Sequence, residues 1–396
     1  MPCATIAAPI RRRRWTASAL LALAAGCATA PPQAPPAGAT APPLVPPPAE
    51  PAFEAPAPVA RARARWVPVG WDVVPGWGAD RTAEVWPALV AGCARPAPGW
   101  AALCARALLE PPAGDADARR WFERWLVPYR VEDLFGAGDG LATGYFEPAI
   151  EASRVRQGAF QVPLYAPPAD LDALRPGWTR REFETVPTAM VSLRGRELAW
   201  IEDPLDALLL QVQGSGRLHL AESDGSRRWV RLAYAAHNGQ PYRSVGRWLV
   251  ERGELELAQA SWPAIRAWAR RNPARLQELL WSNPRVVFFR EEPLADPAIG
   301  PRGGAGVPLT PGRSIAVDPA SIPYGTPVWI DTTEPLGATP LRRLVMAQDT
   351  GSAIEGAVRA DFFWGWGPDA EAQAGRMKQP LRLFVLVPRV QLADRH

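Results

Sequence analysis

The sequence predicts a mainly β protein that also contains helices, with its last strands arranged as a small closed barrel. Short alternating strands begin at Gly140, helices return at 244–281, and a second set of strands fills the C-terminal quarter of the chain. That second set is joined by Gly/Pro turns with no helix in between. Such a series favours a closed barrel over a parallel sheet with crossover helices. The 396 residues are enough for two domains.

The N-terminus has the layout of a bacterial signal peptide over residues 1–26. Four arginines at 11–14 precede an apolar run at 15–25 that is too short to cross a bilayer. The run ends at Leu-Ala-Ala-Gly-Cys27, which resembles a lipobox in which Cys27 is lipidated and becomes the first mature residue. The alternative is an ordinary secretory signal that is cleaved near residues 28–30.

Residues 27–64 are expected to be a linker, because residues 31–60 are nearly all Pro and Ala. Such a segment cannot bury a core, and in extended form it spans about 3.1 Å per residue. The formal net charge of +4 includes the arginines of the leader, so the mature chain is close to neutral. This charge does not indicate a nucleic-acid partner.

The cysteines suit an exported protein. Removal of Cys3 with the leader and lipidation of Cys27 leave Cys93 and Cys104. An even pair in an oxidising compartment predicts one disulfide, which would contribute about 3 kcal/mol by restricting the unfolded chain. Two buried free thiols are the alternative.

Local patterns predict the elements in order. Residues 65–130 are expected to be helical, with helices at 80–89 and 115–126 that begin at Asp or Thr caps. Further helices are expected within 244–281, where Ser261 and Asn272 each stand next to a helix start with proline in the first turn. A hairpin turn is predicted at 223–226. Strands are predicted at 143–148, 198–201, 208–213, 217–221, 228–234, 285–290, 314–318, 327–330, 344–348 and 381–387.

Carboxylates beside aromatic rings are the chemically informative pattern. Asp318, Asp349 and Asp361 stand at the ends of predicted strands, and Trp364 and Trp366 follow the last of them. A single strand-end aspartate is usually a turn former. Carboxylic acids next to flat rings are also what glycoside cleavage requires. Only three histidines are present, so histidine-based catalysis is poorly supported.

Several stretches resemble a known family. The three aspartates with their glycines resemble the three-aspartate (3D) domain, and four further stretches resemble signatures of the lytic transglycosylase A (MltA) family: 143–148, 213–216, 238–246 and 371–375. The resemblance implies a double-psi β-barrel (3D) domain plus an inserted β-barrel-like MltA domain, with a groove between them. The implied parts are 65–145 and 297–390 for the barrel domain and 146–296 for the insert.

The resemblance also implies a reaction. The family cleaves the β-1,4 bond between N-acetylmuramic acid and N-acetylglucosamine without water and leaves a 1,6-anhydro end. Asp361 matches its single acid, which then acts as base. To hold a proton near neutral pH the carboxyl pKa must rise from about 3.9, and burial beside aromatic rings and the charge of Asp349 would both raise it. Asp349 and Asp361 stand twelve residues apart here, against eleven in some members. An insertion in the turn at 357–360 would absorb the extra residue, whereas a shift of strand register would turn Asp361 the wrong way.

Further residues are expected to bind substrate, although for each of them a purely structural role in a turn or in the core is the alternative. Glu147 is expected to orient substrate or pair with an arginine rather than to act as a second acid. No metal or cofactor is predicted, because the histidines are scattered and no calcium-loop pattern is present. The expected substrate-binding residues are Thr143, Tyr145, Gln213, Gly214, Ser215, Asn238, Tyr242 and Asp318.

The predicted partner is the glycan strand of peptidoglycan, and the predicted location is the periplasm, anchored to the outer membrane as a lipoprotein. The sequence carries no signal for a protein partner. Two rival functions stay open at this point: a peptidoglycan-binding scaffold without catalysis, and an ordinary muramidase that leaves reducing ends.

Overall fold

The computed structural model describes residues 56–171 and 177–389. The predicted leader, Cys27 and most of the predicted linker therefore lie outside the described residues. The linker ends earlier than residue 64. β1 (Val59–Ala60) pairs antiparallel with β2 (Arg65–Pro68), and Ala64 is fully buried in the barrel core, so these residues belong to the folded part.

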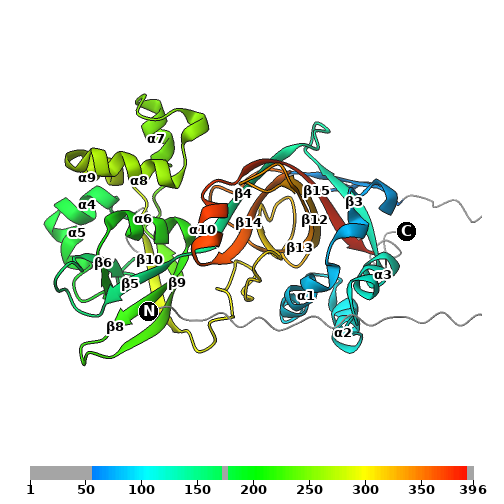
Figure 1. Ribbon diagram of the computed structural model, residues 1–396, viewed down its shortest axis with the longest axis horizontal. Coiled ribbons are helices and arrows are strands. Elements are labelled where there is room, and N and C mark those ends of the chain that lie inside the picture. Colours follow the sequence, from blue (N-terminus) through cyan, green and yellow to red (C-terminus); the bar gives the residue numbers. More distant parts are fainter. Residues whose placement is uncertain (1–55, 172–176, 390–396) are drawn as a thin grey trace, which may run out of the picture. The chain divides into compact units, whose positions relative to one another are not determined.

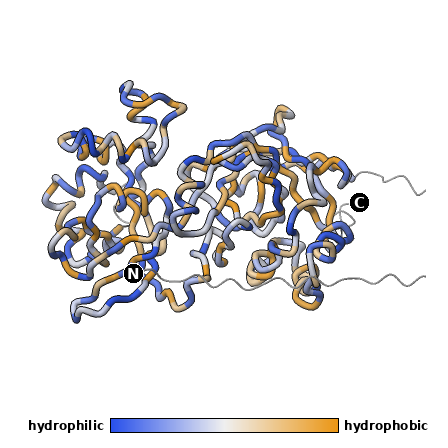
Figure 2. The backbone as a smooth tube through the Cα atoms, viewed as in Figure 1, coloured by the Kyte–Doolittle hydropathy of each residue, from blue (hydrophilic) through white to orange (hydrophobic). Residues whose placement is uncertain are grey.

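A closed ring of strands forms the barrel. The strand order is β1-β2-β3-β15-β12-β13-β11-β14-β4, and β15 also pairs with β4, which closes the ring (Figure 1). Alternate apolar side chains of these strands fill the interior, while Trp329, Leu344 and Phe384 on the opposite face pack against the N-terminal helices. Figure 2 shows hydrophobic stretches along the same strands. The ring strands and their neighbour β3 are β3 (Leu126–Glu132), β4 (Gly140–Glu147), β11 (Ser314–Val317), β12 (Pro327–Thr333), β13 (Pro340–Asp349), β14 (Arg359–Trp366) and β15 (Lys378–Pro388).

The predicted closed barrel is confirmed, with two differences in its strands. Asp361 is expected at the end of a strand but lies within β14, whose range is not among the predicted strands because its Phe-Phe-Trp-Gly-Trp run does not alternate cleanly. The strand predicted at 285–290 is present as β10 (Val287–Pro293) but pairs with β9 outside the barrel. Pairing between strands that are distant in sequence cannot be read from local patterns.

A second sheet has the order β10-β9-β8-β5-β7-β6. The chain passes from β4 into β5 at Pro148 and returns to the barrel strands after β10. The predicted strands at 198–201, 217–221 and 228–234 are confirmed here, as is the hairpin turn, where Ser226 N donates to Asp224. The remaining strands are β5 (Ala149–Ser153), β6 (Val162–Tyr165), β7 (Glu197–Ile201), β8 (Ser215–Ala221) and β9 (Arg227–His237).

The strand predicted at 208–213 is wrong. These residues end helix α6 (Pro204–Gln213), where Asp203 accepts a hydrogen bond from Leu205 N and Gly214 closes the helix with φ of 80°. Pro204 in the first turn and glycine after the last turn are helix boundary signals. The run Leu208-Leu209-Leu210 is buried on all sides, so its apolar character alone could not separate helix from strand.

Helices cover both sheets. The predicted helix at 115–126 is α3, whereas 80–89 begins as a 3-10 turn, η3 (Thr82–Val85), before α1. Cys93 and Cys104, predicted to pair, are joined by a disulfide that links the end of α1 to α2. Within the described residues no helix is long and apolar enough to cross a membrane. The α-helices other than α6 are α1 (Trp86–Gly92), α2 (Ala101–Leu109), α3 (Asp115–Trp125), α4 (Arg180–Thr185), α5 (Pro187–Ser192), α7 (Val245–Glu251), α8 (Trp262–Arg271), α9 (Leu276–Trp281) and α10 (Pro368–Ala374).

Candidate functional site

Asp349 and Asp361 lie on either side of one strand. Ala316 of β11 pairs with Asp361 of β14 and, across its other edge, with Asp349 at the end of β13. Two strand spacings separate the backbones of the two aspartates, which is about 10 Å. The barrel therefore brings together two of the three predicted aspartates.

Asp361 faces away from the barrel interior. Its neighbours Ala360 and Phe362 lie in the barrel core, while Phe363 packs with Tyr145 outside it. By strand alternation Asp361 shares the face of Phe363, so the twelve-residue spacing has not turned it inward. The side chain is half-buried and accepts a 2.6 Å hydrogen bond from the Thr143 hydroxyl.

Burial makes Asp361 a weaker acid than an exposed aspartate, because it raises the carboxyl pKa. Loss of solvent raises the pKa of this carboxyl to about 6, against the hydrogen bond from Thr143 and the charge of Arg359, both of which lower it. Repulsion from Asp349 raises the pKa further, in the predicted direction, but burial is the main cause. A carboxyl with such a pKa holds its proton about a hundred times more often at neutral pH than one near 3.9.

Three donors hold Asp349 in place. The Tyr145 hydroxyl donates at 2.8 Å, and the backbone N–H groups of Gly304 and Thr350 donate at 2.8 Å each. Burial raises the pKa of Asp349, and these hydrogen bonds oppose the rise. Tyr145 is itself buried with its ring 5.1 Å from that of Phe363, so it orients Asp349 and has no free face on which a sugar could stack.

Strand β4 supplies the partners of both aspartates. Thr143 and Tyr145 stand two residues apart on one face of the strand, and each donates to one carboxylate. The residue between them must be glycine, because a Cβ at Gly144 would lie 2.7 Å from the Trp364 ring nitrogen and 3.0 Å from the backbone of Ala374. The stretch Thr-Gly-Tyr therefore has a geometric explanation.

The Asp318 carboxylate is bonded to groups of the fold rather than to the other two aspartates. It is buried, and its carboxylate accepts from Arg63 at 3.0 Å, from Gly356 N at 2.9 Å and from Ala320 N at 2.9 Å. The bond to Gly356 ties it to the turn that precedes β14. Asp318 therefore supports the turn between Asp349 and Asp361, and its described contacts do not join it to either of them.

Asn238 is also held within the fold. It is fully buried, and its amide donates to the carbonyls of Trp178 and Pro284 and accepts from the N–H groups of Val286 and Gln240. All its polar capacity is used within the fold, so it cannot read an acetamido group.

Tyr242, also predicted to bind substrate, lies half-buried before α7. Burial raises the pKa of its hydroxyl, and a hydrogen bond with Ser244 lowers it. The described contacts do not join Tyr242 to either aspartate.

The glycine-rich stretch after α6 meets β4. The Gln213 side chain accepts a 3.1 Å hydrogen bond from Phe146 N, so the end of the helix is tied to the strand that carries Thr143. Gly214 adopts the left-handed conformation that closes the helix, and Ser215 begins β8 in a buried position. These residues lie next to the end of β4 rather than at Asp361 itself.

Glu147 is paired with arginine. It is completely buried at the end of β4, with Arg217 Nε at 2.7 Å and Arg231 Nε at 2.6 Å. Both of its carboxylate oxygens are therefore bonded to arginines inside the fold.

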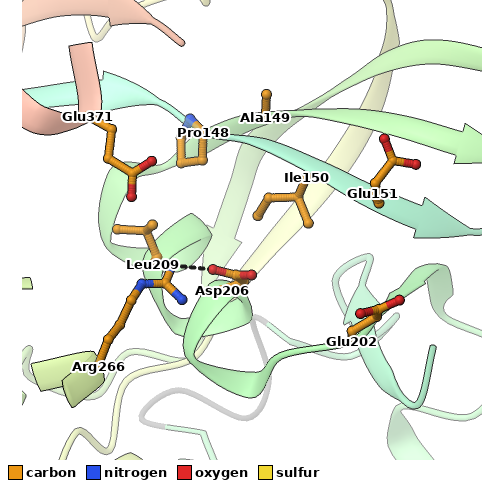
Figure 3. Close-up of a pocket in the computed structure, with 9 residues that line it drawn as sticks. All are labelled: Pro148, Ala149, Ile150, Glu151, Glu202, Asp206, Leu209, Arg266 and Glu371. Atoms are coloured by element: carbon orange, nitrogen blue, oxygen red, sulfur yellow. Dashed lines mark hydrogen bonds and ion pairs between the residues drawn. The ribbon is translucent and has the colours of Figure 1, made fainter. Parts of the chain in front are cut away.

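A cavity of about 300 Å³ lies beside the crossing at Pro148 (Figure 3). Its lining includes four carboxylates and one arginine, and Figure 3 shows Arg266 bonded to Asp206 among them. Asp349 and Asp361 are not part of its lining. The carboxylates are Glu151, Glu202, Asp206 and Glu371.

Two groups at the site were missed in the sequence. Arg359 donates to the Thr143 hydroxyl at 2.9 Å and lowers the pKa of Asp361, and Gly304 N holds Asp349. Arg359 stood in the most informative stretch but two residues from the acid, where a strand would point it to the same side. The Gly303-Gly304 pair was the available signal for the second group.

The geometry can be set beside known proteins. Residues 141–290 match the family model of the MltA specific insert domain, and residues 313–387 match that of the 3D domain. Membrane-bound lytic murein transglycosylase A of Escherichia coli K12 is 32% identical over 276 residues, which cover 68% of this chain and 72% of that protein. The counterpart in Vibrio cholerae is 34% identical over 258 residues, which cover 63% of this chain and 66% of that protein.

Solved structures agree over more of the chain. Lytic transglycosylase LtgG of Burkholderia pseudomallei is 47% identical, with 85% of this chain and 98% of that chain covered and a TM-score of 0.58. MltA of Neisseria gonorrhoeae is 32% identical, with 84% and 95% covered and a TM-score of 0.71. Escherichia coli MltA with bound chitohexaose is 29% identical, with 85% and 95% covered and a TM-score of 0.65.

Proposed function

Since this chain belongs to the MltA family of lytic murein transglycosylases, we propose that it cleaves the β-1,4 bond between N-acetylmuramic acid and N-acetylglucosamine and leaves a 1,6-anhydro end. Asp361 is the proposed catalytic residue. The observation that carries this role is a half-buried carboxyl whose pKa lies at about 6, next to a second carboxylate.

One carboxyl can perform both proton transfers. Protonated Asp361 gives its proton to the bridging oxygen as the bond from C1 of muramic acid to that oxygen breaks. The C6 hydroxyl of the same sugar then bonds to C1 and returns its proton to the Asp361 carboxylate. No water is consumed, and the acid is regenerated. A hydrolase would need a second carboxylate as nucleophile or to activate water.

Asp349 is proposed to keep Asp361 protonated and correctly oriented. Its hydrogen bonds from Tyr145, Gly304 and Thr350 fix its position, and its charge favours the neutral form of Asp361. Thr143 is proposed to orient Asp361 itself.

The products decide the proposal. Purified sacculi incubated with the enzyme should release anhydro-muropeptides that mass spectrometry identifies, and Asp361→Asn should abolish release while the protein still binds sacculi. Reducing ends would instead indicate a muramidase, and binding without release by the unmodified protein would indicate a scaffold. Near-normal turnover by the Asn variant would remove Asp361 from the mechanism.

We further propose that residues 146–296 hold the glycan against the barrel part, which is formed by 65–145 and 297–390. The glycan chain would pass Gln213. The contact between Gln213 and β4 supports this placement, and the Escherichia coli relative binds chitohexaose. Gln213→Ala should raise KM for soluble glycan chains more than it lowers kcat. An unchanged KM would place the glycan elsewhere.

The proposed location is the periplasm, with Cys27 lipidated and held in the outer membrane. The lipobox-like sequence supports this, as do the relatives, which are named membrane-bound. In the native host, Cys27→Ala should move the protein from the outer-membrane fraction to the soluble periplasmic fraction. Retention of the variant in the membrane would show that lipidation is not the anchor.

A further inference from the structure

Three buried charged residues meet at the end of the strand that carries Thr143 and Tyr145. The Glu147 side chain has no exposed surface, and those of Arg217 and Arg231 are each 6% exposed. Arg217 Nε donates to one carboxylate oxygen at 2.7 Å, and Arg231 donates to both through Nε at 2.6 Å and Nη2 at 3.3 Å. These three residues are called the Glu147 cluster below.

The Glu147 cluster holds both places where the chain passes between the two sheets. Glu147 ends β4 immediately before the first crossing at Pro148. On the return from β10, Arg217 donates to the carbonyls of Pro297 and Ile299 at 2.7 and 3.3 Å, and Arg231 donates to that of Ile299 at 2.6 Å. Two arginines of the second sheet therefore bind the outgoing strand and the returning segment together.

The second positive charge of the cluster is also compensated. One carboxylate balances one arginine, and the guanidinium of Arg217 lies 3.8 Å from the centre of the Trp366 ring. Trp366 pairs with Glu147 in the β14–β4 register, five residues after Asp361. The carbonyls and the ring face provide the remaining compensation. The cluster thus touches both strands that carry the site, β4 and β14.

Stability alone does not account for such a cluster. Apolar side chains of similar volume often stabilise a core as well as a buried ion pair does, because buried charges lose their hydration. What charges add is direction, since each guanidinium fixes several acceptors at set angles. Here the fixed acceptors are the end of β4 and the returning segment.

Glu147 shares its strand face with the two residues that hold the acids. Thr143, Tyr145 and Glu147 alternate along β4, where Thr143 donates to Asp361 and Tyr145 donates to Asp349. A displacement at one end of a strand moves side chains four residues away. Misplacement of a reacting group by about 1 Å can cost about a hundredfold in rate.

We propose that the Glu147 cluster is a positioning unit for the transglycosylase reaction: it fixes the end of β4 at both chain crossings and so sets Thr143 and Tyr145 against the two aspartates. This inference rests on the proposed function. Glu147, Arg217 and Arg231 touch no reacting atom in this scheme and act only through β4 and β14.

Glu147→Gln is the first test, because it removes the charge and keeps the shape. With soluble glycan chains as substrate, kcat should fall about 10- to 100-fold while KM changes less than about twofold. The alkaline limb of the pH profile should also move to higher pH, because a weakened bond from Thr143 no longer lowers the pKa of Asp361. The other charged groups that act on Asp361 are Arg359 and Asp349, and neither is altered. A reduced folded fraction would lower rates at every pH and leave the limb in place.

Glu222→Gln is the matched control. Glu222 also accepts from two arginines, Arg154 and Arg228, in the second sheet, but its contacts do not reach β4. The kcat and the pH profile of the Glu222→Gln variant should match those of the unmodified enzyme. The same loss in this control would overturn the inference, because any lost arginine partner in the sheet would then suffice.

Arg231→Lys covers the case in which the first variant does not fold. Lysine keeps the positive charge but cannot span Glu147 and the Ile299 carbonyl as the planar guanidinium does. A fall in kcat of about fivefold or more, with KM retained, supports the inference. Unchanged kcat in a folded variant overturns it, as does a failure of both variants to fold, which would assign the cluster to stability. If the unmodified enzyme releases no anhydro-muropeptides, the proposed function fails first.

Discussion

Replacement of Thr143 by valine tests the acidity of the proposed catalytic residue. The Thr143 hydroxyl donates at 2.6 Å to Asp361, and this bond opposes the burial that raises the carboxyl pKa to about 6. Valine keeps the branched shape of threonine but has no donor. The pKa of Asp361 should therefore rise in the variant.

The size of the effect follows from the bond that is lost. A hydrogen bond to a charged group contributes about 1.5–3 kcal/mol, and about 1.4 kcal/mol corresponds to one pKa unit. The pKa of Asp361 should therefore move from about 6 to about 7–8. Because the acid must hold its proton when the reaction begins, activity falls as pH rises through this pKa. The alkaline limb should move by the same amount to higher pH, and the low-pH plateau should fall about tenfold because the carboxyl is less well oriented.

The assay is the initial rate of anhydro-muropeptide release as a function of pH. Thr143→Ser is the matched control, since it keeps the hydroxyl and should leave the limb in place. Arg359 is the competing influence on the pKa of Asp361. It donates to the Thr143 oxygen at 2.9 Å, and its charge lowers the pKa of Asp361. A limb that stays in place or moves to lower pH would mean that Thr143 does not control the acid.

Three further predictions concern the same residues. Asp361→Asn should stabilise the protein by about 2–3 kcal/mol above pH 6 and not at all below about pH 4, because the folded carboxyl has a pKa of about 6 against about 3.9 unfolded, so its ionisation costs stability as pH rises. Melting temperatures at the two pH values measure this, and equal gains at both would contradict it. Tyr145→Phe should move the alkaline limb slightly to lower pH, since the lost bond raises the pKa of Asp349 and weakens its repulsion of Asp361. Thr143→Val serves as the comparison, because it moves the limb in the opposite direction. Asn238→Ala should cost about 2–4 kcal/mol of stability in a denaturant titration but leave KM unchanged in the folded fraction, whereas a raised KM would restore Asn238 as a substrate contact.

Several barrel strands were predictable because short runs of apolar and β-branched residues stand between Gly and Pro turns. β11 and β12 were found from sequence, and the carboxylates at strand ends pointed to acid chemistry. The local pattern does not predict β14, because its aromatic run interrupts the alternation. It predicts a strand in place of the end of α6, because three consecutive leucines are buried in either structure. In the latter case Asp203, Pro204 and Gly214 carried the deciding signal, since all three are boundary residues of a helix.

The sequence indicates which stretches are distinctive, but not which contact each polar residue in them makes. Asn238 and Asp318 stand in family-like stretches, yet both bond to groups of the fold that include backbone atoms more than thirty residues away. A stretch can be distinctive because it builds the fold around a site. Arg359 shows the converse, since its contact with Thr143 depends on the pairing of β14 with β4, which local sequence does not specify.

That pairing explains how the site is divided along the chain. The segment that matches the 3D domain begins at residue 313 and contains all three aspartates, but the strand that orients Asp349 and Asp361 is β4. β4 also closes the ring by pairing with both β14 and β15. The C-terminal segment therefore carries the aspartates, whereas Thr143 and Tyr145, which donate to two of them, precede the insert. The proposed acid depends on this earlier strand for the hydrogen bond from Thr143, and the Glu147 cluster at the end of the strand also contacts the segment that returns from the insert.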